Sequence, residues 1–209
     1  MEGFAEGIAA QPDDIRIEIV NQIMSLETES KEQKDFLLAW SDPSDADKTK
    51  KEVTQVLYSF NESTPAVKRF LNSWFSSVLN IINNHDELSR NLLSFCGSAC
   101  ANAHATKIFK NVFNQSEDMK DFVDRLNKEL GEGDTFWSYI DESELEVTYP
   151  KCLCPLVSLG LVNQSVWCNC SLHWIKHNFE AILDKKVQVE KRTTVLHGSN
   201  SCRFKVSLS

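Results

Sequence analysis

The chain has 209 residues and a net charge of −8, with 30 acidic residues against 22 basic ones. Its hydrophobic fraction of 42% and charged fraction of 25% are those of a globular protein with a sizeable core, which excludes a wholly disordered chain. The acidic balance argues against a nucleic-acid partner, because the short basic runs Lys185-Lys186 and Lys191-Arg192 do not form a basic face.

The sequence contains no stretch of about 18 apolar residues, so we expect no membrane-spanning helix. The first residues carry neither a basic start nor an apolar stretch, and we therefore expect no secretory leader. A cytoplasmic protein is the resulting expectation, and its seven cysteines would stay reduced. Reduced cysteines serve in metal sites, in catalysis or in plain packing rather than in a disulfide framework.

Apolar side chains recur at helical spacing through the first 130 residues, which predicts a mainly helical region. Pro65 stands at a favoured first helical position, with Ser63 and Thr64 as its cap. The glycines at 131–134 are expected to end the last helix and form a turn. The predicted helices cover 15–40 with a break near residues 29–30, then 48–60, 65–82, 86–104, 105–113 and 116–130.

The apolar pattern then changes from helical to alternating, which is typical of strands. Two hairpins are predicted, one with its turn at 141–144 and one with its turn at 197–200. Between them, Ser171 caps a helix expected over 171–183. The predicted hairpin strands are 135–140 with 145–149, and 186–196 with 202–208.

These elements predict an α+β fold, in which an N-terminal helical region is followed by an antiparallel sheet with a packed helix. We expect a helical N-terminal region at 1–85 and an α+β domain with a cysteine-containing pocket at 86–209.

Two Cys-x-Cys pairs lie close together, Cys152 with Cys154 and Cys168 with Cys170. In an extended backbone, residues two apart point to the same face, so each pair would aim two sulfur atoms one way. Prolines on either side of the first pair place it in a short or edge strand. The four thiols are candidates for metal ligands, redox partners or nucleophiles, and burial as small hydrophobic residues is the alternative.

Cys96, Cys100 and His104 recur every four residues, so on a helix they share one stripe. Zinc takes thiolate and imidazole ligands in a tetrahedral set. Packing of Cys96 and Cys100 against the sheet is the alternative. The expected ligands of zinc or a similar ion are drawn from Cys96, Cys100, His104, Cys152, Cys154, Cys168 and Cys170.

Cys170 and His173 are the candidates for catalysis. The start of a helix favours a thiolate, and Cys170 directly precedes the helix predicted from Ser171. His173 follows three residues later and carries an imidazole, a group suited to acid–base catalysis. An exposed polar residue on a helix is the alternative interpretation of this histidine.

Several motifs of the second half also carry a resemblance. They are Cys96-Gly97-x-x-Cys100-Ala101, Cys152-x-Cys154-Pro155, Cys168-x-Cys170-Ser171-x-x-Trp174 and the ending Gly198-x-x-x-Cys202-x-Phe204. In these motifs the chain resembles a family of uncharacterised bacterial proteins over about residues 90–208. More distantly it is similar to the 4-vinyl reductase domain, which binds small molecules, and to L-2-amino-thiazoline-4-carboxylic acid hydrolase-like proteins. The resemblance implies an α+β pocket domain with cysteines near the pocket.

We therefore expect a small-molecule-binding protein with a cysteine-rich site suited to zinc, acting as a hydrolase on a C–N or C=N bond. A non-catalytic ligand sensor and a thiol redox protein are the alternatives. In the sensor, the helical first half would couple to a partner or to a second copy of the chain in a homodimer.

Overall fold

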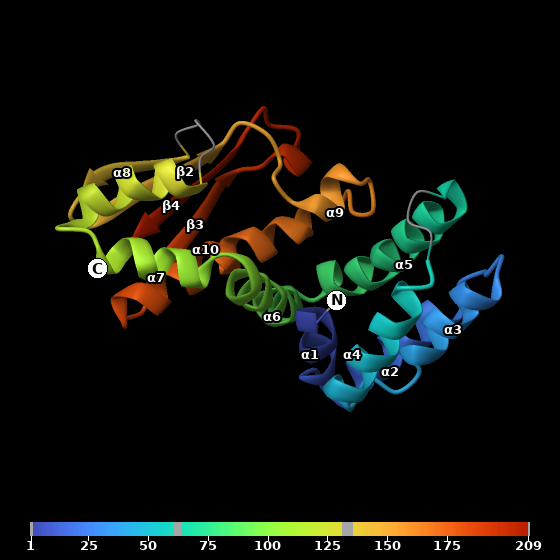
Figure 1. Ribbon diagram of the computed structural model, residues 1–209. Coiled ribbons are helices and arrows are strands. Elements are labelled where there is room, and N and C mark those ends of the chain that lie inside the picture. Colours follow the sequence, from blue (N-terminus) through green and yellow to red (C-terminus); the bar gives the residue numbers. More distant parts are fainter. Residues whose placement is uncertain (1, 61–63, 131–135, 209) are drawn as a thin grey trace. The chain divides into compact units, whose positions relative to one another are not determined.

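The computed structural model describes residues 2–60, 64–130 and 136–208, and of residues 2 and 86–90 it describes the backbone alone (Figure 1). The fold is α+β, as predicted, with helices first and a four-stranded antiparallel sheet in the C-terminal part. The chain forms two compact units: a helical unit of Met1–Cys96 and Cys154–Trp167, and a sheet unit of Gly97–Leu153 and Cys168–Ser209. The expected domains 1–85 and 86–209 stay a prediction.

The helical unit follows the predicted helices closely. The predicted break lies between α2 and α3, where the Ser30 side chain caps α3 by accepting a hydrogen bond of 3.2 Å from the Gln33 backbone N–H. Pro65 begins α5, as predicted. Of the two proposed caps, Thr64 stands at the N-cap position but its side chain makes no capping hydrogen bond, and Ser63 lies outside the described residues. The sequence predicted no element where α1 lies. The unit contains α1 (Glu2–Ala9), α2 (Asp13–Met24), α3 (Lys31–Ala39), α4 (Ala46–Leu57), α5 (Pro65–Asn84), the first part of α6 (Asp86–His104), α9 (Pro155–Ser158) and the 3-10 turn η1 (Ser165–Trp167).

Aromatic rings fill the core of the helical unit. Trp40 and Trp74 are fully buried, with their ring centroids 5.0 Å apart. Trp167 of η1 joins the same cluster, with its ring 6.0 Å from that of Phe4 and 5.8 Å from that of Phe75. The rings therefore hold a late segment of the chain against the first helices.

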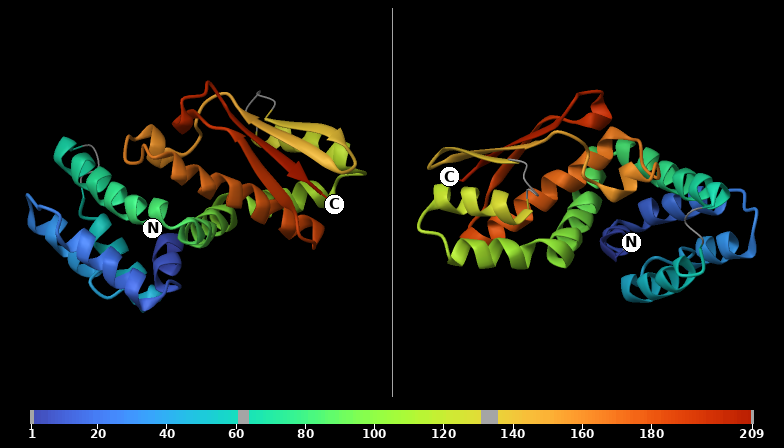
Figure 2. Two further views of the ribbon diagram at one scale, coloured as in Figure 1. Left: turned by 180° about the vertical axis from the view of Figure 1, so that it is seen from behind. Right: turned by 45° about the horizontal axis from the view of Figure 1, so that its top comes forward.

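The sheet unit is built on both predicted hairpins. All its strands are antiparallel in the order β1-β2-β4-β3, and α7, α8 and α10 lie on one side of the sheet (Figures 1 and 2). The glycine turn predicted at 131–134 lies outside the described residues. The unit contains the rest of α6, α7 (Thr106–Asn114), α8 (Met119–Leu130), β1 (Trp137–Asp141), β2 (Glu144–Tyr149), α10 (Cys168–Leu183), β3 (Gln188–Thr193), the 3-10 turn η2 (Val195–His197) and β4 (Cys202–Ser207).

Alternation along the strands separates a core face from a charged face. Phe204 and Val206 of β4 are buried against the helices. On the other face, the Arg203 guanidinium donates to both carboxylate oxygens of Glu146 at 2.8 and 2.9 Å. Charged residues paired across neighbouring strands thus mark the outer face of the sheet as the one turned to solvent.

Two expectations about the cysteine segments are wrong. The residues at 152–154 form no strand, because Cys154 leads directly into α9 with Pro155 at its first position. Helix α10 begins at Cys168, three residues before the predicted start. Residues two apart on a helix point about 200° apart, so Cys168 and Cys170 do not share a face.

Within the described ranges, no helix is both long enough and apolar enough to span a membrane.

Candidate functional site

One end of the sheet gathers several cysteines of the sheet unit. Because the strands are antiparallel, β2 and β3 end there while β1 and β4 begin there (Figure 1). Cys202 opens β4 directly opposite Tyr149, the last residue of β2. Cys152 follows Tyr149 by three residues in the chain. We call this end of the sheet the thiol end.

The start of α10 lies at the thiol end as well. The Lys191 ammonium of β3 donates a hydrogen bond of 2.8 Å to the Asn169 side-chain oxygen, which ties the first turn of α10 to the sheet. Cys168 is 6% exposed, whereas Cys170 is half-buried. Both thiols therefore belong to this end of the unit, in different surroundings.

Polar groups line the inner side of the thiol end. Burial, and to a smaller degree the neighbouring Cys202 thiol, raises the pKa of Tyr149 above its ordinary value, so its hydroxyl stays protonated. The Cys202 sulfur accepts a hydrogen bond of 3.4 Å from the Val195 backbone N–H. The Trp137 indole N–H and the Thr194 hydroxyl are buried and find no hydrogen-bond partner in the part of the chain that the structure describes. Two unsatisfied polar groups in a core are costly unless water or a ligand meets them.

Helix α10 places Cys170, His173 and His177 on one face, since these residues are three and four positions apart. The opposite face carries Ile175 and Phe179, which are fully buried in the core of the sheet unit. The amphipathic pattern of α10 thus fixes the orientation of its polar face.

Both histidines of this face are held neutral. Burial is the main cause that lowers the pKa of His173; Lys176 adds to the effect and Glu180 opposes it. Burial also lowers the pKa of His177, whose Nε2 lies 2.8 Å from the Asn102 side-chain oxygen of α6. Neutral imidazoles at pH 7 are suited to accept a proton or to bind a metal.

Gly97 of α6 makes a close approach to α10. A Cβ atom at this position would lie 2.6 Å from the Cys170 carbonyl oxygen, 2.7 Å from the His173 Cβ and 2.8 Å from the Trp174 backbone nitrogen. Only glycine fits without displacing backbone atoms. The glycine of the Cys-Gly motif therefore brings α6 against Cys170 and His173.

The sequence-predicted site residues divide between the two units. Cys96 and Cys154 lie in the helical unit, where the Cys154 sulfur accepts a hydrogen bond of 3.3 Å from the Trp167 indole N–H. Those in the sheet unit are Cys100, His104, Cys152, Cys168, Cys170 and His173.

Cys100 and His104 are exposed on α6, so packing of Cys100 against the sheet is wrong as an explanation of that cysteine. Among the described residues, no group of three or more His, Cys, Asp or Glu side chains is placed to hold a metal ion. The zinc site stays a prediction.

Sequence reasoning missed several residues around the thiol end. Tyr149 was a strand residue without a role, although the alternation of β2 could have placed it on the inner face. Thr194 and Asn102 carry no signal in the sequence, because their positions depend on contacts between distant segments. For Gly97 the sequence shows only that it is part of a motif and does not predict its close approach to α10.

No curated protein matches the chain, and no solved structure does. One family model matches residues 41–209, a range that includes the whole sheet unit and all seven cysteines. The match extends well beyond half of the sequence. The chain thus belongs to the family of unknown function DUF6144.

Proposed function

We propose that the protein binds a small molecule and hydrolyses a C–N or C=N bond in it, with Cys170 as nucleophile and His173 as base. The observation that carries the proposal is the shared face of these two residues in the first two turns of α10. Side chains three residues apart on a helix are neighbours, within about 5–6 Å between their Cβ atoms. This is the separation at which an imidazole can take a proton from a thiol, directly or through one water.

The local surroundings suit each role. Cys170 is the third residue of α10, where the backbone N–H groups of the first turn favour a thiolate. Burial lowers the pKa of His173, so the imidazole is neutral and ready to accept a proton at pH 7. Lys176 and Glu180, one and two turns further along, complete the charged surroundings of this histidine.

The chemistry proceeds in two steps. The Cys170 thiol passes its proton to His173, and its sulfur attacks the carbon of the C–N or C=N group. At an amide or amidine carbon this addition opens the C=O or C=N π bond. When that double bond re-forms, the C–N single bond breaks, the nitrogen leaves with the proton that His173 returns, and the substrate carbon stays bound to sulfur. His173 then takes a proton from water, whose oxygen attacks that carbon and releases the product together with the Cys170 thiol.

The resemblance to the 4-vinyl reductase domain supports the small-molecule part of the proposal, and the hydrolase-like proteins support the bond that is cleaved. A cytoplasmic setting belongs to the proposal too, because a nucleophilic thiol must stay reduced.

The test is turnover of a panel of thiazoline and amide substrates by the whole chain. Cys170→Ser and His173→Gln are expected to lower kcat by at least about a hundredfold. Cys100→Ser is the matched control, because it removes an exposed thiol from α6. Turnover that survives Cys170→Ser would overturn the proposed mechanism, and a co-purified ligand without turnover in the wild type would favour a sensor.

Zinc is the second candidate, favoured by the gathering of Cys152, Cys168, Cys170 and Cys202 at one end of the sheet unit. Three of these thiols would have to approach one another more closely than they do, since no such group is placed for a metal among the described residues. Elemental analysis of protein purified without added metal tests this. A metal-free sample whose Tm does not change with a chelator would exclude a structural zinc.

The thiol redox alternative is tested by counting thiols before and after a mild oxidant, and a constant count would remove it. Light scattering tests the expected homodimer.

A further inference from the structure

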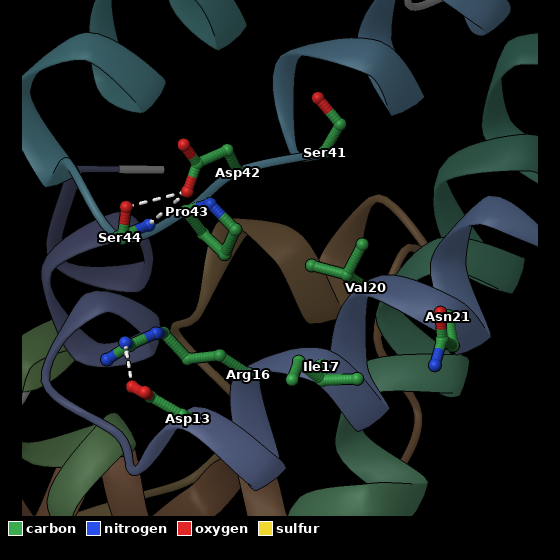
Figure 3. Close-up of a pocket in the computed structure, with 9 residues that line it drawn as sticks. All are labelled: Asp13, Arg16, Ile17, Val20, Asn21, Ser41, Asp42, Pro43 and Ser44. Atoms are coloured by element: carbon green, nitrogen blue, oxygen red, sulfur yellow. Dashed lines mark hydrogen bonds and ion pairs between the residues drawn. The ribbon is translucent and has the colours of Figure 1, made fainter.

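A hollow of about 300 Å³ lies in the helical unit, between α2 and the loop that joins α3 to α4 (Figure 3). Its volume is at the lower end of the range for small-molecule sites. The family match begins at residue 41, so the α2 wall lies outside it. The hollow belongs to the helical unit, whereas the thiol end belongs to the sheet unit. The lining residues are Asp13, Arg16, Ile17, Val20, Asn21, Ser41, Asp42, Pro43 and Ser44.

The one basic side chain of the lining is already engaged. Nη1 of Arg16 donates to the backbone oxygens of Ala9, the last residue of α1, at 3.0 Å and of Gln11, two residues further on, at 2.6 Å. Nη2 of the same residue forms an ion pair with Asp13. Arg16 thus satisfies carbonyl groups near the end of a helix, and its charge is compensated by Asp13.

Asp42 is different, because its carboxylate forms no ion pair with any other described residue. One carboxylate oxygen accepts hydrogen bonds from the Ser44 backbone N–H at 3.3 Å and from the Ser44 hydroxyl at 2.6 Å. These hydrogen bonds are the main cause that lowers the pKa of Asp42, so the group is charged at neutral pH. Its other oxygen is available to a ligand.

The apolar wall of the hollow consists of Ile17, Val20 and Pro43. Ile17 is 59% exposed, although it is a large aliphatic side chain, whereas Val20 is half-buried and Pro43 is buried. The wider field has the same sign as Asp42, since residues 1–60 contain 13 acidic and six basic residues, a net charge of −7 out of −8 for the chain. An acidic field of this kind attracts cations.

We infer that this hollow binds a small organic cation, with its ammonium group on Asp42 and its apolar part over Ile17 and Val20. A neutral molecule of the same shape lacks the charge interaction, and an anion is repelled.

The experiment titrates benzylammonium into the isotope-labelled whole chain at neutral pH and follows backbone amide signals by NMR. The expected shifts map to the lining residues, and the affinity falls as salt is raised from about 50 to 500 mM, because an exposed ion pair is screened. Benzyl alcohol and benzoate are the neutral and anionic comparisons. Equal binding of benzyl alcohol, or shifts that map elsewhere, would overturn the inference.

Asp42→Asn is the decisive variant, because an asparagine oxygen still accepts both hydrogen bonds from Ser44. It is expected to weaken benzylammonium binding about 3- to 10-fold, in keeping with a charge-assisted contact. Glu52→Gln, an exposed site on α4, makes the same change in net charge away from the hollow and leaves binding unchanged. Ile17→Gln changes a side chain that is 59% exposed; it tests the apolar wall and is expected to weaken benzylammonium binding as well. Unchanged binding in either hollow variant would contradict the proposed site.

Discussion

The contrast between Cys168 and Cys170 shows how position on a helix sets the surroundings of a side chain. Cys168 lies on the same side of α10 as Ile175 and Phe179 and is buried with them. Cys170 points the other way, onto the face of His173 and His177, and is half-buried. A thiol on the buried face is inert packing, whereas one beside a neutral imidazole has a base within reach.

The two half-buried imidazoles, whose pKa values are lowered in the folded state, should make stability depend on pH. An unfolded histidine takes up a proton near pH 6.5, and folded His173 does so only at lower pH because burial lowers its pKa. The unfolded state therefore binds more protons as the pH falls through 6.5, so the free energy of unfolding decreases from there downward. Carboxylates with a lowered pKa, such as that of Asp121, also make the free energy of unfolding depend on pH. They do so only near and below their ordinary pKa of 3.8, outside this interval.

Urea unfolding of the wild type at pH 7.5 and 5.5 measures this loss, and His173→Gln is expected to lose less stability over the same interval. His197→Gln, at an exposed position, serves as the control and keeps the wild-type difference. A His173→Gln protein with the same pH dependence as the wild type would show that burial of this imidazole is not coupled to folding.

A buried hydrogen bond joins α7 to α10. The Thr106 hydroxyl donates to the Asn178 side-chain oxygen at 2.9 Å, and the Asn178 amide donates to the Trp174 carbonyl oxygen at 2.9 Å. Thr106→Val keeps the shape but leaves the Asn178 oxygen without a donor, which should cost about 1–3 kcal/mol. Chemical denaturation checks this. Thr193→Val, on the half-exposed end of β3, is a comparison expected to cost less; an equal cost would mean that burial adds nothing at Thr106.

At the scale of elements, the alternation of apolar and polar residues made the strands of the sheet predictable from the sequence. Local capping signals did not always predict where a helix begins. Cys202, Phe204 and Val206 alternate with charged residues, so β4 and its partners were found from the sequence. Pro155 was interpreted as limiting a strand, but a proline equally begins a helix, and the fold uses it to start α9. Ser171 was a plausible cap for α10, yet the helix begins earlier because η1 leads directly into it.

Gly97→Ala tests the crossing of α6 and α10. In an open helix, alanine stabilises relative to glycine by about 1 kcal/mol. Here the added Cβ would meet the Cys170 carbonyl oxygen at 2.6 Å, so we expect destabilisation of about 1–3 kcal/mol instead. Chemical denaturation of the Gly97→Ala protein gives the sign of the change in unfolding free energy, and this sign distinguishes a close crossing from an open helix. Ser98→Ala, the next residue of α6, is the control and should lie within about 0.5 kcal/mol of the wild type. A stabilised Gly97→Ala protein would show that the two helices do not approach so closely.

At the scale of the whole molecule, the chain leaves the sheet unit and returns to it. The segment Cys154–Trp167 belongs to the helical unit, where Gly160 and Leu161 accept hydrogen bonds of 3.1 and 3.2 Å from the Asn72 side chain. These partners are 88 and 89 residues apart in sequence, and no periodicity or motif could have joined them. The same limit explains the site: the sequence indicates which thiols are unusual, but only the fold assigns Cys154 to the helical unit and Cys168 and Cys170 to the sheet unit.

Alkylation of the seven cysteines by iodoacetamide, followed by mass spectrometry, reports on this whole arrangement at once. Cys100 is the exposed thiol and should react early, while Cys168 and Cys202 are buried and should react only when the protein unfolds. Cys96, Cys152 and Cys154 are half-buried and should fall between these limits.

Cys170 is equally half-buried, so a rate above those three would come from its thiolate character rather than from exposure. In His173→Gln that excess should disappear while the order of the other thiols stays the same. Rapid reaction of Cys168 in the folded protein would contradict the described packing of α10, whereas an ordinary rate at Cys170 would leave the fold intact and count against its role as nucleophile.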